Sequence, residues 1–261
     1  MKLSIITINL NNVEGLKKTA VSIAEQTFQD FEWIIIDGGS TDGSVEAMSE
    51  YDGIISFMVS EKDSGIYNAM NKGVSRASGD YLLFLNSGDC LSGPNVLESV
   101  FREQFAEDII YGDLLTEDNF GVIKEMKYED TLSFHSLYRF SLPHPSSFIA
   151  RHLLLKYPYD ERYRIVSDKE FYIKMALRGY SFRHISCFVS IFDNSGISSC
   201  NPQKVLEEDL KMRNAIIPSC IRVDYSEGRI GSLIELRRKY RIFGKFITFC
   251  IIVMEKLDGW L

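Results

Sequence analysis

Three acidic, glycine-rich turns stand between residues 34 and 89, each at the end of an apolar run. They read IIIDGGSTDGS at 34–44, SEKDSGIYNAMNKG at 60–73 and DYLLFLNSGD at 80–89. Strand ends supply rigid anchors, glycines let the backbone approach a ligand closely, and carboxylates hold a hard cation. Together the three turns favour a site for a nucleotide and a metal ion.

Each turn offers its own contact. Asp37 can accept a hydrogen bond from a base N–H or a ribose hydroxyl. Gly65 precedes a predicted helix, and a helix N-terminus suits a phosphate. Asp89 lies just past a buried strand, where a carboxylate suits a divalent cation that bridges phosphates. Taken singly, each turn could equally be a plain turn or a capped surface helix, but three of them at successive strand ends argue against coincidence.

The elements that must position these turns alternate between strand and helix. Apolar runs predict strands at 3–8, 31–36, 54–59 and 81–85, and helical spacing predicts helices at 13–27, 44–49 and 67–77. Short connections between them imply right-handed βαβ units. We therefore expect an α/β fold with a mostly parallel central sheet flanked by helices.

The second half of the chain has a looser pattern. We predict helices at 95–105, 151–156, 168–178 and 204–216, a strand pair at 108–115 and 121–126, and an extended segment at 181–192, whereas 131–147 has the composition of a loop. The segment after the first strand, TINLNN, lacks the GxGxxG of a nicotinamide oxidoreductase. It also lacks the glycines and basic residues expected of a nucleotidyltransferase, which counts against both classes.

Bulk properties narrow the class of protein further. A chain of 261 residues can form one large domain or one domain with an appendage. Its net charge of −7 argues against a general nucleic-acid binder. Five widely spaced cysteines without a CxxC motif favour the reduced thiols of a cytoplasmic protein. No run of about 18 apolar residues predicts a spanning helix, and MKLSIITINLNN is expected to be a first strand rather than a signal peptide.

The motifs SIITINLNN, IIIDGGSTDGS, DSGIYNAMNKG and FLNSGD occur in the order and spacing of family 2 inverting glycosyltransferases with the GT-A fold. The chain resembles this family over 1–200, and its NSGD motif is similar to that of the subgroup that builds bacterial capsular and exopolysaccharides. The resemblance implies a UDP-sugar donor, a glycan or lipid-linked acceptor, and Mn²⁺ or Mg²⁺ at the diphosphate. It also implies a nucleotide-sugar half at 1–105, an acceptor half at 106–200 and a helical C-terminal extension at 201–261.

The resemblance assigns a role to individual residues of the first half. The nucleotide contacts fall on Thr7, Asn9, Asp37, Asp63, Gly65, Asn71 and Lys72. The usual D-x-D-D metal motif is replaced here by Asn86-Ser87-Gly88-Asp89. Asp89 is therefore the expected carboxylate ligand, and Asn86 is expected to contribute a carbonyl or water-mediated contact.

An inverting transferase needs a base that takes the proton of the acceptor hydroxyl, and it needs electrostatic help for the departing diphosphate. In the family the base is the aspartate of an E-D pair that opens a helix of the second half. Asp168 matches that aspartate, with Ser167 in place of the glutamate, and Glu170 is the reserve candidate. The alternative for Asp168 is a helix-terminal acid that the helix dipole favours. The resemblance also places His144 near the acceptor or diphosphate, and the loop 192–199 near the diphosphate.

Basic and apolar residues alternate in the segment 237–254. Such a segment suits an anionic membrane surface, which would make the protein peripheral at the inner face of the cytoplasmic membrane. It equally suits a helix that packs on the domain or on a second copy in a homo-oligomer. Two rival functions stay open: a nucleotidyltransferase, and a non-catalytic sugar-nucleotide-binding protein, because the metal and E-D motifs both lack acids.

Overall fold

A computed structural model gives the structure of this chain and describes residues 2–117, 121–194, 196, 201–219 and 221–222. The chain divides into two compact units, Met1–Glu208 and Asp209–Leu261. The predicted membrane or subunit contact at 237–254 lies outside the described residues, as do residues 195 and 197–199 of the predicted loop 192–199. No helix among the described residues is long and apolar enough to cross a bilayer.

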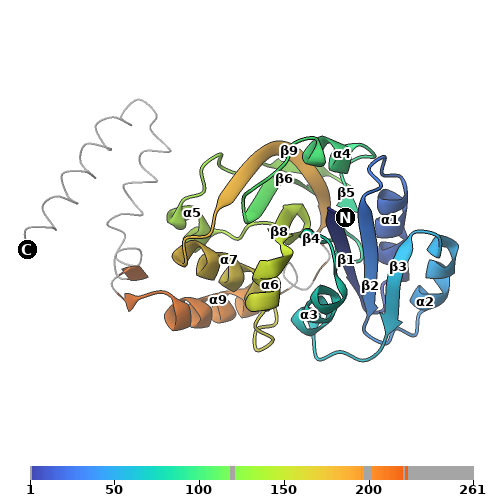
Figure 1. Cartoon of the computed structure of the whole chain (residues 1–261). Coiled ribbons are helices and arrows are strands. Elements are labelled where there is room, and N and C mark those ends of the chain that lie inside the picture. The colour runs from blue at the N-terminus through green and yellow to red at the C-terminus, as the bar shows by residue number, and fades with distance from the viewer. Residues whose placement is uncertain (1, 118–120, 195, 197–200, 220, 223–261) are drawn as a thin grey trace, which may run out of the picture. The chain divides into compact units, whose positions relative to one another are not determined.

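The first half of the sheet is parallel throughout (Figure 1). Its strands, in spatial order, are β3 (Ile55–Ser60), β2 (Phe31–Asp37), β1 (Leu3–Asn9) and β4 (Tyr81–Phe84). The connections contain α1 (Val13–Ala24), α2 (Ser44–Ala47) with a following 3₁₀ turn (Met48–Tyr51), and α3 (Ile66–Arg76). This part of the structure confirms the βαβ units that the sequence predicts.

Alternating side chains of these strands pack against helices on both faces of the sheet. Ile5 and Trp33 belong to the same buried cluster as Leu16 of α1. On the other face α3 approaches through Gly73, where a Cβ atom would lie 2.4 Å from Ile6 Cγ2. The strands are covered on both sides, which explains why their sequences are nearly continuous apolar runs.

The second half adds antiparallel strands, so the complete sheet is mixed. Beyond β4 it continues through β8 (Ser147–Ala150), β6 (Ile109–Glu117), β9 (Phe182–Asp193) and β5 (Cys90–Leu91), and β7 (Ile123–Met126) pairs with β6. β8 is antiparallel to both β4 and β6, whereas β6 and β9 run parallel. The prediction of a mostly parallel sheet therefore holds for the first four strands and for the pair β6 and β9, whereas β8, β5 and β7 add antiparallel pairs that this prediction did not include. Short strands such as β5 and β8 carry too few residues for a clear pattern.

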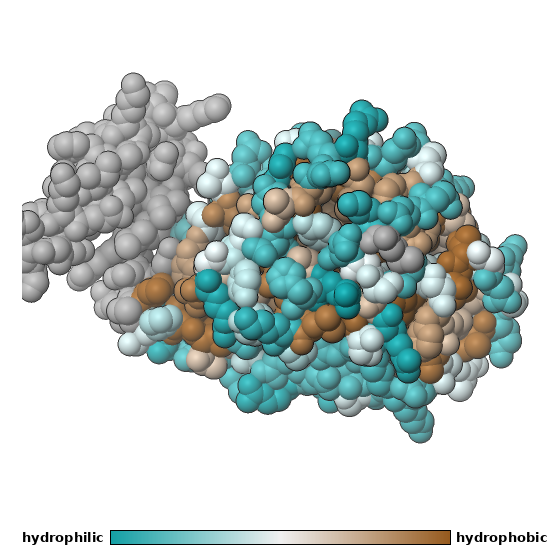
Figure 2. Space-filling view, viewed as in Figure 1, coloured by the Kyte–Doolittle hydropathy of each residue, from teal (hydrophilic) through white to brown (hydrophobic). Residues whose placement is uncertain are grey.

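The helices of the second half are α4 (Val96–Phe101), α5 (Phe134–Arg139), a 3₁₀ turn (His144–Ser146), α6 (Arg151–Lys156), α7 (Ser167–Leu177) and α9 (Pro202–Ile216). The segment 131–147 is therefore not a plain loop as predicted. Ser133 caps the N-terminus of α5, where its side chain accepts a hydrogen bond from the Ser136 N–H. Polar side chains cover most of the face in Figure 2, and the apolar residues gather in separate patches.

Candidate functional site

The turns after β1, β2, β3 and β4 meet at one edge of the sheet. Asn12 Nδ2 donates a hydrogen bond to the carbonyl oxygen of Ser87 at 3.1 Å, which joins the turn after β1 to the turn after β4. A Cβ atom on Gly38 would lie only 2.7 Å from Asp63 Oδ2. The Asp63 carboxylate thus occupies space that a side chain at position 38 would need, and the turns after β2 and β3 are in contact.

Asp37 is fully buried and saturated with hydrogen bonds. Its carboxylate accepts from Ser40 Oγ and Ser60 Oγ, both at 2.6 Å, and from Asn9 Nδ2 at 2.8 Å. Burial alone would raise the pKa of Asp37, but the hydrogen bonds from Ser40, Ser60 and Asn9 lower it below its ordinary value. Asn9 Oδ1, by contrast, is buried and finds no partner among the described residues. At this edge of the sheet, Asn9 Oδ1 is therefore an acceptor that is available to a ligand.

The turn after β3 leads directly into α3. Asp63 Oδ1 accepts the N–H of Gly65 at 2.9 Å, and Gly65 adopts a φ of +140° that an L side chain rarely takes. Lys72 Nζ lies 2.7 Å from Glu61 Oε1. Asp63 and Gly65 therefore shape the turn, and the Lys72 charge is paired beside it.

Two further predicted nucleotide contacts have their polar atoms engaged inside the protein. Thr7 is fully buried, and its hydroxyl accepts the Nε1–H of Trp33 at 2.9 Å. The Asn71 amide donates to the carbonyl oxygen of Tyr159 at 2.9 Å and accepts the Tyr159 N–H at 3.0 Å. The structure does not bring these two groups to the open end of the site, and a nucleotide contact by either stays a prediction.

The turn after β4 is anchored by α1 and holds Asp89. Thr19 Oγ1 accepts the Gly88 N–H at 3.0 Å and donates to the Asp89 carbonyl oxygen at 2.7 Å. The Asp89 carboxylate is buried, and its Oδ1 accepts the backbone N–H of Asp193 at 3.0 Å. The last residue of β9 therefore lies directly beside the predicted metal ligand.

The carboxylate of Asp193 lies close in space to Gly88, one of the two positions at which the D-x-D-D metal motif lacks an acid. A Cβ atom on Gly88 would be 2.6 Å from Asp193 Oδ2. Carboxylate oxygens are the ligands that Mn²⁺ and Mg²⁺ prefer. The described residues contain no group of three or more His, Cys, Asp or Glu side chains arranged to hold a metal ion. Within the described part of the chain, a cation at this turn would therefore have fewer than three such ligands, as in Mg²⁺ sites completed by water and substrate phosphates.

His144 links the predicted metal ligand to the predicted base. Its Nε2 lies 3.7 Å from Asp89 Oδ2, and its Nδ1 lies 3.7 Å from Asp168 Oδ2. Burial alone would lower the pKa of His144, but the carboxylates of Asp168 and Asp89 raise it to about 9. The ring therefore carries a positive charge at neutral pH, between two carboxylates.

The Asn86 amide is the other polar neighbour of this ring. Asn86 Nδ2 is placed 3.0 Å from His144 Nε2, and Asn86 Oδ1 is buried without a partner among the described residues. A protonated ring donates through Nε2, and an amide turned by 180° would accept this hydrogen bond through its oxygen. The Asn86 amide thus forms a hydrogen bond with His144 in this structure. A contact between Asn86 and a metal ion stays a prediction.

Asp168 lies in the first turn of α7, with its two oxygens in different surroundings. Oδ1 accepts the Tyr67 hydroxyl at 3.1 Å and the Lys169 N–H at 2.8 Å. Oδ2 faces His144. The side chain remains 16% exposed, so a substrate can reach it.

Glu170, the reserve candidate for the base, pairs with a residue away from His144 and Asp168. It is buried and forms an ion pair with Lys174, one turn further along α7, at 2.5 Å. Burial raises the pKa of Glu170, and the Lys174 charge opposes that rise. Residues two positions apart point to different sides of a helix, which explains why Asp168 reaches His144 and Glu170 pairs elsewhere.

Sequence reasoning missed two residues of the site. Tyr67 stands in the motif SGIYNAMNKG, but its partner Asp168 is 101 residues away. Asp193 is 104 residues from Asp89. It stands in the loop 192–199 that the resemblance places near the diphosphate, but the sequence assigned no role to the acid itself. Both contacts join separate elements, which local patterns do not reveal.

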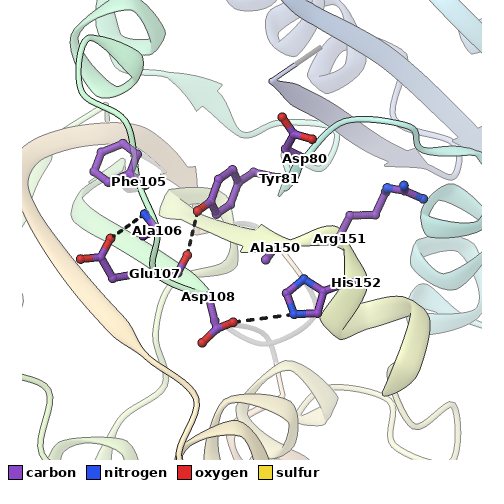
Figure 3. A pocket seen from close by; sticks show the side chains of 9 residues that line it. All are labelled: Asp80, Tyr81, Phe105, Ala106, Glu107, Asp108, Ala150, Arg151 and His152. Atoms are coloured by element: carbon purple, nitrogen blue, oxygen red, sulfur yellow. Dashed lines mark hydrogen bonds and ion pairs between the residues drawn. The ribbon is translucent and has the colours of Figure 1, made fainter.

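A pocket of about 320 Å³ lies outside this group of residues (Figure 3). Its lining comes from the start of β4 and the end of β8, namely Asp80, Tyr81, 105–108 and 150–152. In Figure 3, His152 points toward Asp108, whereas Arg151 points away from it. Because Asp89 follows the other end of β4, this pocket is not part of the candidate site.

Comparison with known proteins finds glycosyltransferases among the relatives. The sequence model of glycosyl transferase family 2 matches residues 4–178. An uncharacterised glycosyltransferase of Mycobacterium tuberculosis is 33% identical over 218 residues, which cover 80% of this chain and 81% of that protein.

Solved structures with a similar fold include two proteins in complex with nucleotides or nucleotide sugars. Staphylococcus aureus TarS 1-349 in complex with UDP has a TM-score of 0.63 at 21% identity, covering 74% of this chain and 60% of that one. The mannosyltransferase PcManGT from Pyrobaculum calidifontis, in complex with GDP-Man and Mn²⁺, has a TM-score of 0.59 at 16% identity, covering 73% and 56%. At these identities the likeness shows the fold, a curled mixed sheet flanked by helices.

Proposed function

Because the chain belongs to glycosyltransferase family 2 and has a GT-A-like fold, we propose that it is an inverting transferase with Asp168 as the general base. It moves a sugar from a UDP-sugar to an acceptor hydroxyl. The observation that carries this proposal is the His144 ring, which lies 3.7 Å from Asp89 on one side and 3.7 Å from Asp168 on the other. The residue expected beside the diphosphate and the residue expected beside the acceptor are thus separated by one imidazole ring.

The turns after β1, β2 and β3 form the nucleotide end of the site. The unpartnered Asn9 Oδ1 fits a ligand N–H such as that of a uracil ring. Asp37 holds Asn9 in place through the 2.8 Å hydrogen bond, and Asp63 with Gly65 shapes the neighbouring turn. A UDP complex of TarS, which shares the fold, supports a uridine nucleotide.

Mn²⁺ or Mg²⁺ fits the donor set of the turn after β4. Asp89 and Asp193 supply hard carboxylate oxygens there. PcManGT, which shares the fold, is described with Mn²⁺. When bound, such a cation would supply positive charge to the departing diphosphate.

The reaction is a single displacement at the anomeric carbon. The acceptor oxygen forms a bond to that carbon from the side opposite UDP, and the bond between the carbon and the UDP oxygen breaks with its electron pair going to UDP. Asp168 Oδ2 takes the proton of the acceptor hydroxyl. In this proposal the charged His144, which lies beside Asp89, stabilises the negative charge that develops on the leaving diphosphate. Attack from the opposite side inverts the anomeric configuration.

The acceptor is proposed from the NSGD motif and from the segment 237–254. The motif resembles that of enzymes for capsular and exopolysaccharides, whose acceptors are lipid-linked glycans. The basic and apolar residues of 237–254 fit a peripheral contact with an anionic membrane surface. We propose a lipid-linked glycan acceptor at the inner face of the cytoplasmic membrane.

The test is release of UDP from a panel of UDP-sugars with lipid-linked acceptors, in Mn²⁺ and in EDTA. Asp168→Asn is expected to lower kcat about 10²- to 10⁴-fold with unchanged UDP affinity. Glu46→Gln is the matched control, because it also removes an acid from the first turn of a helix. Full turnover by Asp168→Asn would exclude it as the base, and failure of the wild-type protein to bind UDP would exclude a uridine donor.

A further inference from the structure

The hydroxyl of Tyr67 connects the nucleotide-binding motif to the second half of the chain. Tyr67 lies in the first turn of α3, two residues after Gly65, and is 5% exposed. Its hydroxyl lies 2.7 Å from the carbonyl oxygen of Ile165 and 3.1 Å from Asp168 Oδ1. The ring packs against Tyr159, with the two centroids 5.4 Å apart. The ring position is therefore fixed by packing, and the hydroxyl by two acceptors that flank the start of α7.

We propose that Tyr67 is the positioning residue of the base, holding Asp168 through Oδ1 so that Oδ2 receives the acceptor's proton. This inference rests on the proposed role of Asp168. A carboxylate oxygen has two lone pairs, and those of Oδ1 are taken by the Tyr67 hydroxyl and by the Lys169 N–H at 2.8 Å. Oδ2 faces His144 at 3.7 Å, so it is the oxygen on the side of the proposed reaction centre.

The Tyr67 hydroxyl has one proton and two acceptors, and this arrangement distinguishes the two states of the base. With Asp168 ionised, donation to Oδ1 is favoured because hydrogen bonds to a charged acceptor are stronger. Once Oδ2 has taken the proton, Oδ1 is a weaker acceptor, and the hydroxyl can donate to the Ile165 carbonyl oxygen instead. Tyr67 thus favours the ionised base before the reaction without leaving an unpaired group after it.

The hydroxyl is available as a donor over the working pH range. Burial, together with the charge of Asp168, raises the pKa of Tyr67 well above its ordinary value. It therefore remains protonated and cannot itself act as a base near neutral pH. The role open to it is to orient Asp168.

Tyr159 offers a matched control for the Tyr67 hydroxyl. It is buried, lies against Tyr67, and its hydroxyl has no hydrogen-bond partner among the described residues. Tyr159→Phe and Tyr67→Phe therefore remove the same atoms from neighbouring buried rings. They differ in that only the second removes a donor to Asp168.

We expect Tyr67→Phe to lower kcat about 10- to 100-fold, the effect of losing a hydrogen bond to a charged group. The donor KM and the UDP dissociation constant should change less than about twofold, because the ring and the α3 turn remain. Tyr159→Phe should leave kcat, the donor KM and the UDP dissociation constant unchanged.

The outcomes separate this inference from the proposed function. If Asp168→Asn abolishes turnover but Tyr67→Phe behaves like Tyr159→Phe, the role of Tyr67 is overturned and the base assignment stands. If Asp168→Asn turns over normally, both are overturned. Should Tyr67→Phe fail to fold, 4-aminophenylalanine at position 67 keeps a weaker donor in the same place. It should then give an intermediate fall in kcat, and an unchanged kcat would overturn the inference.

Discussion

Replacement of Gly88 by alanine tests the arrangement of the turn after β4. Gly88 has a φ of +107°, and a Cβ atom there would lie 2.6 Å from Asp193 Oδ2 and 3.3 Å from Asp193 Cβ and Cγ. To reach the 3.4 Å of an ordinary contact, the carboxylate must move by about 0.8 Å. The backbone of Asp193 is held beside this turn, because its N–H donates to Asp89 Oδ1 at 3.0 Å.

The expected loss of stability has two parts. A left-handed backbone costs an alanine about 1–2 kcal/mol, and forcing an extra group into a packed site costs about 1–3 kcal/mol. Gly43→Ala isolates the first part, because Gly43 has a φ of +88° and nothing lies within 4 Å of its Cβ position. Gly88→Ala should therefore cost about 1–3 kcal/mol more than Gly43→Ala, or about 2–12 °C in Tm for a domain of this size.

Thermal and urea unfolding of the two variants measure this difference. Adding Asp193→Ala to Gly88→Ala should recover the extra cost, because it removes the group that is struck, whereas adding it to Gly43→Ala should recover nothing. Equal Tm values for Gly88→Ala and Gly43→Ala would refute the placement of Asp193 against position 88. So would a failure of Asp193→Ala to relieve Gly88→Ala.

Three further predictions follow from single contacts. Asp193→Asn should weaken Mn²⁺ binding in the presence of UDP by about 10-fold, as measured by electron paramagnetic resonance of free Mn²⁺. If the variant binds Mn²⁺ as tightly as the wild-type protein does, Asp193 is not part of the metal site. Thr7→Val should lower the free energy of unfolding by about 1 kcal/mol, because the hydrogen bond to Trp33 is lost. The UDP dissociation constant should stay unchanged. A weaker UDP complex would instead support Thr7 as a nucleotide contact. Glu32→Gln should cost about 2 kcal/mol at pH 7. Burial would raise the pKa of Glu32, but hydrogen bonds from the residues around it lower it below the ordinary 4.5. The stability that the ionised Glu32 contributes is therefore full above pH 4.5 and is lost as pH falls through the lower folded-state pKa. A difference in stability between wild type and Glu32→Gln that grows on acidification would contradict this.

Local patterns predicted the elements that depend on local interactions. The strands β1 and β2 and the helices α1 and α3 lie within a few residues of their predicted ranges, because each is long enough to show its period. The helix α6 has the predicted bounds of 151–156. The pattern failed where an element is short or where its partner comes from far along the chain. β8 has four residues, too few to show a period. α5 has six residues, as α6 does, but it lies in the segment 131–147, whose composition is that of a loop.

The candidate site divides along the same line. The motif order indicated that Asp37, Asp63 and Asp89 follow successive strands, and parallel strands bring their carboxyl ends to one edge. Packing decided which atoms at that edge are available to a ligand. Asp37 has its lone pairs filled by neighbours, and the unpartnered acceptor is on Asn9.

By itself the sequence determined the family, the α/β order of the first half and the identity of the acids that could do chemistry. The tertiary structure decided which of those acids meet. His144 joins Asp89 to Asp168, and Tyr67 joins α3 to α7. These contacts depend on how antiparallel strands of the second half close against the parallel first half. Contacts between residues about 100 positions apart arise from the packing of whole elements, which no local spacing encodes.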